Sequence, residues 1–215
     1  MKALRFVTMS LGLLATPALA YGQACLGSPI TAGQYGIEGG MGVGEGFKTY
    51  SGGVNANVDG PLAFGGAVGI TKPDAGGENM TTLGLAGGYE LLQGSRLSAC
   101  PTVGVNYSTF STNILGTEMD MNQFVVPVGV GLGTTLPAGS MNVTLFAMPQ
   151  FLWFRTSASS GGESVSDTQN EFGVNTGLRV GMSSFYAGAG MSMNSIENSD
   201  PVFSFGVGLV LGGRR

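Results

Sequence analysis

The stretch FVVPVGVGLGTTL, Phe124 to Leu136, carries a large apolar residue at every even position from Phe124 to Leu132. The odd positions between them are mostly glycine, as at Gly129, Gly131 and Gly133. Successive side chains of a β-strand point to opposite faces of the sheet. One face of this strand is therefore hydrocarbon, whereas the other is nearly bare backbone.

The same alternation recurs along the chain and predicts an all-β fold of about ten strands. The first two strands are the least regular, because Glu45 falls on the face that Ile37 and Met41 make apolar. We expect a bulge or an earlier strand end at this point, and eight strands are the alternative count. The predicted strands are 35–47, 52–58, 62–71, 82–91, 96–108, 123–135, 141–155, 171–182, 185–193 and 202–212.

The connections between these strands alternate in length, which predicts a single up-and-down antiparallel meander. Tight turns are expected at 59–61, 93–95, 137–140 and 183–184, and polar loops at 48–52, 72–81, 110–122, 156–170 and 194–201. Pro101, Pro127 and Pro149 fall inside predicted strands, where each lacks the N–H that a ladder needs. Bulges or broken strands are therefore expected at the prolines.

The composition decides which face meets which environment. The chain has 39 glycines and only 10% charged residues, whereas soluble domains carry about 25%. A soluble sheet would present charged residues on its water-facing side, but here that side carries Gly, Ala, Ser, Thr and Asn. Large apolar residues pointing outward and small residues pointing inward are typical of a transmembrane β-barrel. The sheet should close on itself, because every backbone polar group in hydrocarbon must be paired.

Residues 1–20 are predicted to be a secretory signal peptide. Lys2 and Arg5 precede an apolar run, and Ala18-Leu19-Ala20 provides the small-x-small cleavage pattern. A lipoprotein anchored through Cys25 is the weaker alternative. Residues 21–33 are then a periplasmic N-terminal segment and residues 34–215 the barrel domain. Without Lys2 and Arg5, the 9 basic residues become 7 against 13 acidic ones, which argues against nucleic acid as a partner.

In its signal peptide, alternating strands, short turns at one end and long loops at the other, the chain resembles the small outer-membrane β-barrels of Gram-negative bacteria, such as the OmpA membrane domain and OmpX. The resemblance lies in architecture and carries over no functional residues. It implies location in the outer membrane, with membrane lipid or lipopolysaccharide and the barrel-assembly machinery as partners. One departure is the ending GLVLGGRR, since such proteins often end in an aromatic residue.

Two cysteines, Cys25 and Cys100, allow one intramolecular disulfide in an exported chain. We predict this bridge, which would tie the N-terminal segment to the barrel mouth, over two free buried thiols. A count of free thiols in the denatured, unreduced protein would distinguish the two.

Three charged residues, Glu38, Glu90 and Arg179, fall on inward faces of the predicted strands. Charges in a narrow lumen should be paired or hydrated. They are expected to form an ion-pair network that fixes the barrel, with a selectivity or gating point of a small pore as the alternative.

Other features leave two interpretations open. The longer loops carry acids that either bind divalent cations between lipopolysaccharide phosphates or are simply solvated. Aromatic residues near strand ends fit either membrane-interface girdles or ordinary strand preference. These aromatic residues are Tyr35, Phe151, Trp153, Phe154 and Tyr186.

The functional expectation is a non-enzymatic outer-membrane barrel with an envelope-structural or surface-interaction role. The chain contains no histidine, which excludes the histidine-dependent catalytic arrangements of barrel enzymes, and no metal-ligand cluster or cofactor motif is recognisable. The alternatives are a narrow pore for small solutes and a soluble exported barrel that binds a ligand.

Overall fold

The computed structural model describes residues 33–57, 61–74, 78–92, 97–114, 117–161, 163–182, 184–195 and 200–212. No helix long and apolar enough to cross a membrane occurs within these ranges. The strands are β1 (Gln34–Gly44), β2 (Phe47–Asn57), β3 (Leu62–Pro73), β4 (Met80–Tyr89), β5 (Leu97–Ile114), β6 (Thr117–Ala138), β7 (Met141–Ser160), β8 (Glu163–Met182), β9 (Phe185–Asn194) and β10 (Val202–Leu211).

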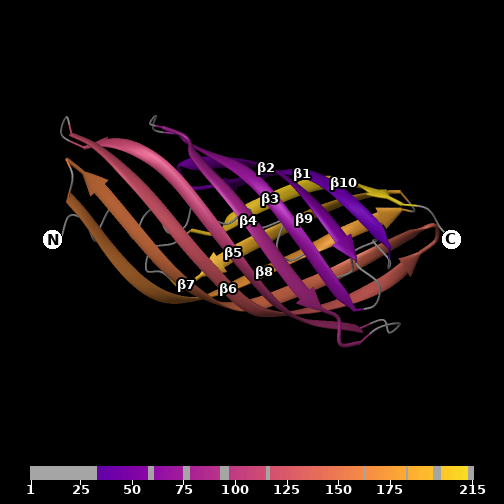
Figure 1. The fold of residues 1–215 in the computed structure, drawn as a ribbon. Coiled ribbons are helices and arrows are strands. Elements are labelled where there is room, and N and C mark those ends of the chain that lie inside the picture. The colour runs from indigo at the N-terminus through magenta and orange to yellow at the C-terminus, as the bar shows by residue number, and fades with distance from the viewer. Residues whose placement is uncertain are drawn as a thin grey trace.

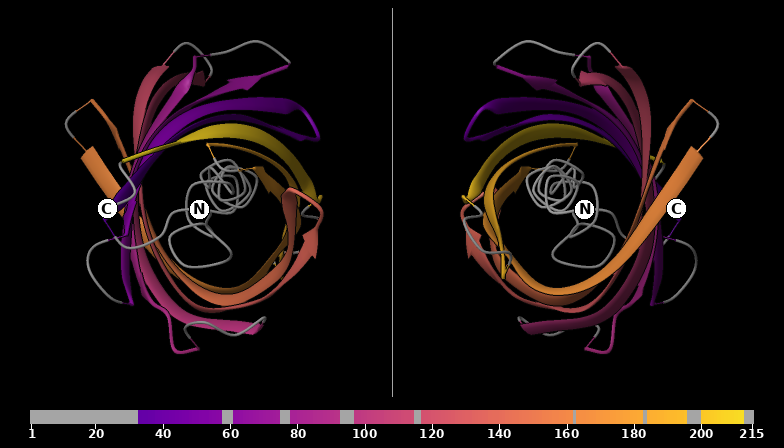
Figure 2. Two further views of the ribbon diagram at one scale, coloured as in Figure 1. Left: turned by 90° about the vertical axis from the view of Figure 1, so that its right-hand side faces the viewer. Right: turned by 90° about the vertical axis from the view of Figure 1, so that its left-hand side faces the viewer.

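The ten strands form one closed antiparallel barrel (Figures 1 and 2). Each strand pairs with its neighbours in the chain, and β1 closes the ring by pairing with β10 from Tyr35↔Leu211 to Val43↔Phe203. The predicted fold class and the count of ten strands are confirmed. The proposed signal peptide and most of the segment 21–33 lie outside the described residues and stay predictions.

The outer surface of the barrel is apolar, as the alternation predicts. Phe124, Val128 and Leu209 are 38%, 49% and 53% exposed, although such side chains are normally buried. On the inner face, Gly129 follows Val128 and Gly208 precedes Leu209, whereas Phe124 lies between the buried Gln123 and Val125. Outward apolar residues such as these surround the barrel, and we call the ring that they form the apolar belt.

Two of the predicted long loops are in fact strands. The β5–β6 ladder continues to Ile114↔Thr117 and the β7–β8 ladder to Ser160↔Glu163, so 110–122 and 156–170 are mostly paired backbone. These segments extend beyond the apolar belt, so their outward side chains are polar. The strands still form there, because backbone hydrogen bonds between strands do not depend on apolar side chains. The prediction of loops was wrong because it relied on an apolar face to recognise a strand.

The first hairpin also differs from its prediction. β1 ends at Gly44, which agrees with the expected early strand end, and residues 45–46 form the turn. Gly46 has a φ of 76°, a value that suits glycine in a two-residue hairpin turn. The expected loop at 48–52 is therefore part of β2.

The three strand prolines are accommodated without any bulge. Pro101 lies one residue past the last β4–β5 pair, Gly88↔Thr102. Pro127 coincides with a gap in the β5–β6 ladder between Val103↔Val128 and Asn106↔Val125, and the register is the same on both sides. Pro149 coincides with a similar gap in the β6–β7 ladder between Gly129↔Gln150 and Leu132↔Ala147. Only local pairing is lost.

A charge placed in the middle of the belt tests its orientation. Val207 is outward-facing and 52% exposed. In lipid vesicles, Val207→Arg should lower the free energy of unfolding by about 2–4 kcal/mol, the usual cost of a lipid-facing arginine near the bilayer midplane. Ser157→Arg on β7, beyond the belt, should cost less than about 0.5 kcal/mol, as an ordinary surface substitution does. Equal effects in a urea titration would show that the belt does not face lipid.

Candidate functional site

A cluster of three polar side chains lies inside the barrel where β8, β9, β10 and β1 meet. The hydroxyl of Tyr186 donates a hydrogen bond to Oε2 of Glu38 at 3.0 Å. The guanidinium of Arg179 lies 4.9 Å from the centre of the Tyr186 ring, within cation–π range. Arg179 and Tyr186 are each only 3% exposed. We call Glu38, Arg179 and Tyr186 the lumen cluster.

Glycines on the neighbouring strands make room for these large side chains. Gly208 of β10 is the register partner of both Glu38 and Tyr186, and Gly188 of β9 is the partner of Arg179. A Cβ on Gly208 would meet the Tyr186 ring directly. The tyrosine therefore lies flat across β10, which lets its hydroxyl reach a carboxylate two strands away.

The cluster combines opposite charges in a confined space. The carboxylate of Glu38 and the guanidinium of Arg179 attract each other. Glu38 Oε1 and Arg179 Nη2 are buried and form no hydrogen bond within the described chain. Both residues line a cavity of about 10 Å³, together with glycines such as Gly53 and Gly206. This volume is on the scale of a single water molecule.

The structure thus brings together two of the three predicted lumen charges. Glu90 follows the end of β4, where its backbone N–H donates to the carbonyl of Pro61 at 2.8 Å. It belongs to the turn end of the barrel, and partial burial raises the pKa of its carboxyl above the usual value. Whether any of the three residues serves a structural or a conducting role stays a prediction.

The sequence reasoning missed Tyr186 as a lumen residue. The sequence left Tyr186 and Phe154 open between interface aromatics and ordinary strand residues; both point inward, and Phe154 packs with Val125 and Leu152 inside the barrel. The alternation of side chains along the strand could have identified Tyr186 as inward-facing, because position 186 is on the same face as Gly188 and Gly190. Nearness to a strand end was the weaker criterion.

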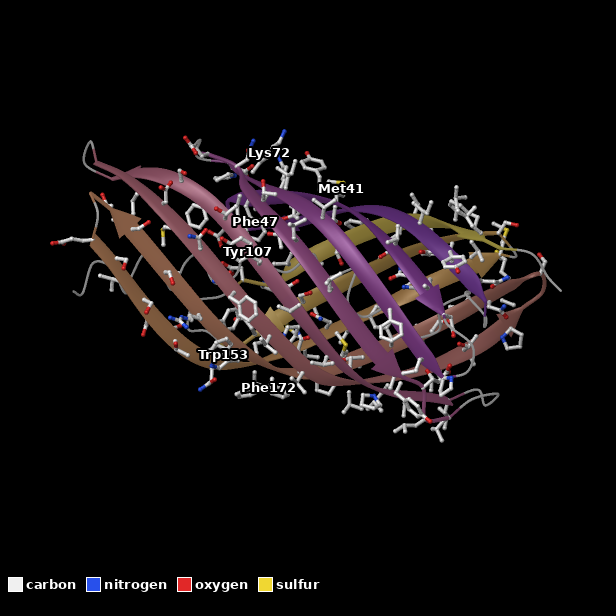
Figure 3. The ribbon with its side chains drawn as sticks, viewed as in Figure 1. Met41, Phe47, Lys72, Tyr107, Trp153 and Phe172 are labelled. Carbon is white, nitrogen blue, oxygen red and sulfur yellow. The ribbon has the colours of Figure 1, made fainter. Side chains whose placement is uncertain are left out.

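Other aromatic side chains do face outward at the border of the belt. Tyr107, Trp153 and Phe172 lie in a band across the barrel (Figure 3), and β5–β8 are the strands that extend furthest beyond it. The rings of Trp153 and Phe124 make an edge-to-face contact with centroids 6.1 Å apart. We call Tyr107, Phe124, Trp153 and Phe172 the aromatic border. It agrees with an interface girdle.

Cys100 is fully buried on the inner face of β5, next to Ala63. Its predicted partner, Cys25, lies outside the described residues. The disulfide therefore stays a prediction.

The acidic residues at the long-loop end mostly have protein partners. Asp74 pairs with Lys48 at 3.5 Å, and Asp120 accepts a hydrogen bond from Ser111 at 2.7 Å. Asp200 lies beside Glu45 and raises the pKa of that carboxyl. Within the described ranges, no group of three or more potential metal ligands occurs.

Removing the hydroxyl of the lumen cluster tests its contribution to stability. Tyr186→Phe should lower the free energy of unfolding by about 1–3 kcal/mol, because Glu38 loses a buried hydrogen bond. Tyr107→Phe is the matched control, since its hydroxyl donates to Asn122 at 2.8 Å on the exposed surface. The control should cost less than about 1 kcal/mol in the same denaturant titration. A larger loss for Tyr107→Phe would contradict a structural role of the cluster.

No protein-family model and no curated protein matches the chain. Among solved structures, the translocator domain of the autotransporter NalP from Neisseria meningitidis is similar, with a TM-score of 0.54 and 13% identity over 82% of this chain and 86% of that one. The attachment invasion locus protein Ail of Yersinia pestis gives 0.46 and 14% identity, covering 84% of this chain and 100% of Ail. The outer membrane protease OmpT from Escherichia coli gives 0.45 and 9% identity, covering 84% of this chain and 95% of OmpT. With its closed ten-stranded architecture, the chain has the fold of a small outer-membrane β-barrel.

Proposed function

We propose that the protein is a non-enzymatic barrel of the outer membrane that contacts partners outside the cell through the extended parts of β5–β8. These parts are residues 109–114, 117–123, 155–160 and 163–171, and we call them the outer sheet. The observation that carries the proposal is that the four strands continue as paired backbone beyond the aromatic border (Figure 1).

Among the described strands, none covers the two edges of the outer sheet. The β8–β9 ladder ends at Gly173↔Asn194, and the β4–β5 ladder ends at Thr81↔Thr109. Ser195 caps the first of these ends, because its hydroxyl accepts from the Phe172 N–H at 3.0 Å and donates to Glu171 at 2.6 Å. Beyond this cap, the β8 backbone pairs with no strand of the described chain on this side, and such an edge offers hydrogen-bonding groups to a partner.

The outward face of the outer sheet is polar, with side chains such as Ser111, Asn122, Arg155 and Ser157. It resembles the surface of a soluble protein more than a lipid-facing wall. A barrel that is anchored by an apolar belt and carries a polar sheet of paired strands beyond it suits contact with molecules in the surrounding medium.

The two alternative functions have less support. A soluble barrel would leave the exposed apolar belt in water, which is unfavourable for so large a surface. A pore would have to conduct past Glu38, Arg179 and Tyr186, which line a cavity of about 10 Å³ at the inner wall. The non-enzymatic assignment is supported by the sequence, which has no histidine to act as a general base.

Shortening the outer sheet tests the surface role. Residues 112–119 and 158–165 would each be replaced by a two-residue turn, which leaves the belt and the lumen cluster intact. The purified variant should keep the heat-dependent gel mobility of a closed barrel. Cells that produce it should adhere less than wild-type cells to surfaces coated with glycans or extracellular proteins.

A topology control belongs to the same experiment. An epitope inserted after Gly161, in the β7–β8 turn, should be labelled on intact cells, and one after Gly139, in the β6–β7 turn, only after permeabilisation. Both glycines have positive φ values, 58° and 65°, so the two insertions are matched. Labelling at Gly139 on intact cells, or unchanged adhesion of the shortened variant on every surface, would refute the proposal.

Conductance separates the surface role from a pore. Purified wild-type protein in planar bilayers should show no discrete channel steps, because the proposed surface role needs no conducting lumen. Reproducible steps that change size in Arg179→Gln would favour the pore instead, since they would place this residue on the conduction path.

A further inference from the structure

Two lysines occupy directly opposite positions on the outer face of the barrel. Lys48 of β2 and Lys72 of β3 are register partners, and both are exposed. Like charges that face each other across a strand pair destabilise a sheet. Their only acidic partner among the described residues is Asp74, which pairs with Lys48 at 3.5 Å while both side chains are about half exposed, at 50% and 51%. Such an exposed pair is weak, and the three groups together keep a net positive charge.

The lysine pair stands at the border of the apolar belt. The ammonium of Lys72 lies 5.7 Å from the centre of the Tyr50 ring, and Tyr50 and Ile70 are the next outward residues on the two strands. Figure 3 shows Lys72 at the rim of the barrel, close to the band that contains Tyr107. Lysines at such a border extend their ammonium groups toward the polar headgroups.

An apolar groove begins below the pair on the same two strands. It has a volume of about 710 Å³ and is lined by Gly52, Val54, Gly66, Val68, Leu83 and Leu85, among others. The valines and leucines are about half exposed and form its walls, while the glycines form its floor.

Packing within the barrel does not demand a glycine at the head of this groove. A Cβ on Gly52 would meet only the Glu38 carbonyl oxygen, at 3.8 Å, and one on Gly39, its register partner, only that of Ser51, at 3.8 Å. Both distances are ordinary contacts. The missing side chains therefore shape the outer surface and leave a depression where neighbouring strands carry large residues.

From the position of these two features we propose a lipid site on β2–β4. The phosphate of a lipid in the outward-facing leaflet binds between Lys48 and Lys72, and one of its acyl chains lies in the groove over Gly52 and Gly66. The charge of the pair is complementary to a phosphate, for which lysine is a common ligand. The inference rests on the proposed outer-membrane location, and it names a lipid that the barrel binds there.

The test uses the full-length barrel, stripped of lipid in detergent and mixed with lipid A or with the same lipid after removal of its phosphates. Native mass spectrometry counts the lipids that stay bound. Wild type should retain one molecule of lipid A in preference to the dephosphorylated form. Lys48→Gln/Lys72→Gln should reduce retention roughly tenfold, given the contribution of basic residues near an anionic surface. Gly52→Val, which fills the groove, should have a similar effect.

Two control variants make the same kinds of substitution at positions away from the proposed site. Arg155→Gln removes an outward cation on β7, and Ala187→Val enlarges an outward small residue on β9; both should bind lipid A like wild type. Inorganic phosphate separates a lipid site from a simple anion site, because its protection of the lysines from acetylation should be unaffected by Gly52→Val. Equal retention by wild type and the double lysine variant, or loss of retention in the controls as well, would overturn the proposal.

Heat-dependent gel mobility distinguishes this failure from failure of the proposed function. A barrel that keeps this property but does not discriminate between the two lipids refutes only the lipid site. A protein that stays soluble and monomeric without detergent refutes the membrane location itself.

Discussion

The structure depends on one constraint, which is that no backbone N–H or C=O can remain unpaired in hydrocarbon. The pairing of β1 with β10 meets it by removing the last two edges of the sheet. Once the ring is closed, each side chain points either outward or into the lumen. The outward ones must suit lipid, and the inward ones must fit a narrow space, so the alternation of bulky apolar residues with glycine follows from closure.

The same constraint explains why the polar features lie where they do. Within the belt, a large polar side chain can only point inward, and glycines on neighbouring strands make room for the largest ones. Tyr186 over Gly208 and Arg179 beside Gly188 are examples. Outside the belt the constraint no longer holds, so that β5–β8 can carry polar residues on their outward face and leave their edges uncovered. The lysine pair of β2 and β3 lies at the boundary between the apolar belt and the part of the barrel outside it.

Much of this could be predicted from the sequence, because period two is a strong signal wherever one face is apolar. The closed barrel, the strand count and the inward positions of Glu38 and Arg179 all follow from it. The outer sheet could not be recognised in this way, since residues 110–122 and 156–170 lack the apolar face that marks a strand in lipid. The contact between Glu38 and Tyr186 could not be predicted either, because it depends on the shear that brings β9 and β1 into register across β10. Glu90 was placed inside a predicted strand, but β4 ends one residue before it, at Tyr89.

The prolines of β6 and β7 have a mechanical consequence. The gap beside Pro127 separates β6 from β5, and the gap beside Pro149 separates β6 from β7 a few residues further along. β6 is thus the one strand of the described barrel with an interrupted ladder on both flanks. Fewer cross-links resist shearing there, so the wall is softest along this strand, and a bilayer that squeezes the cylinder would flatten it into an ellipse by bending at β6 first.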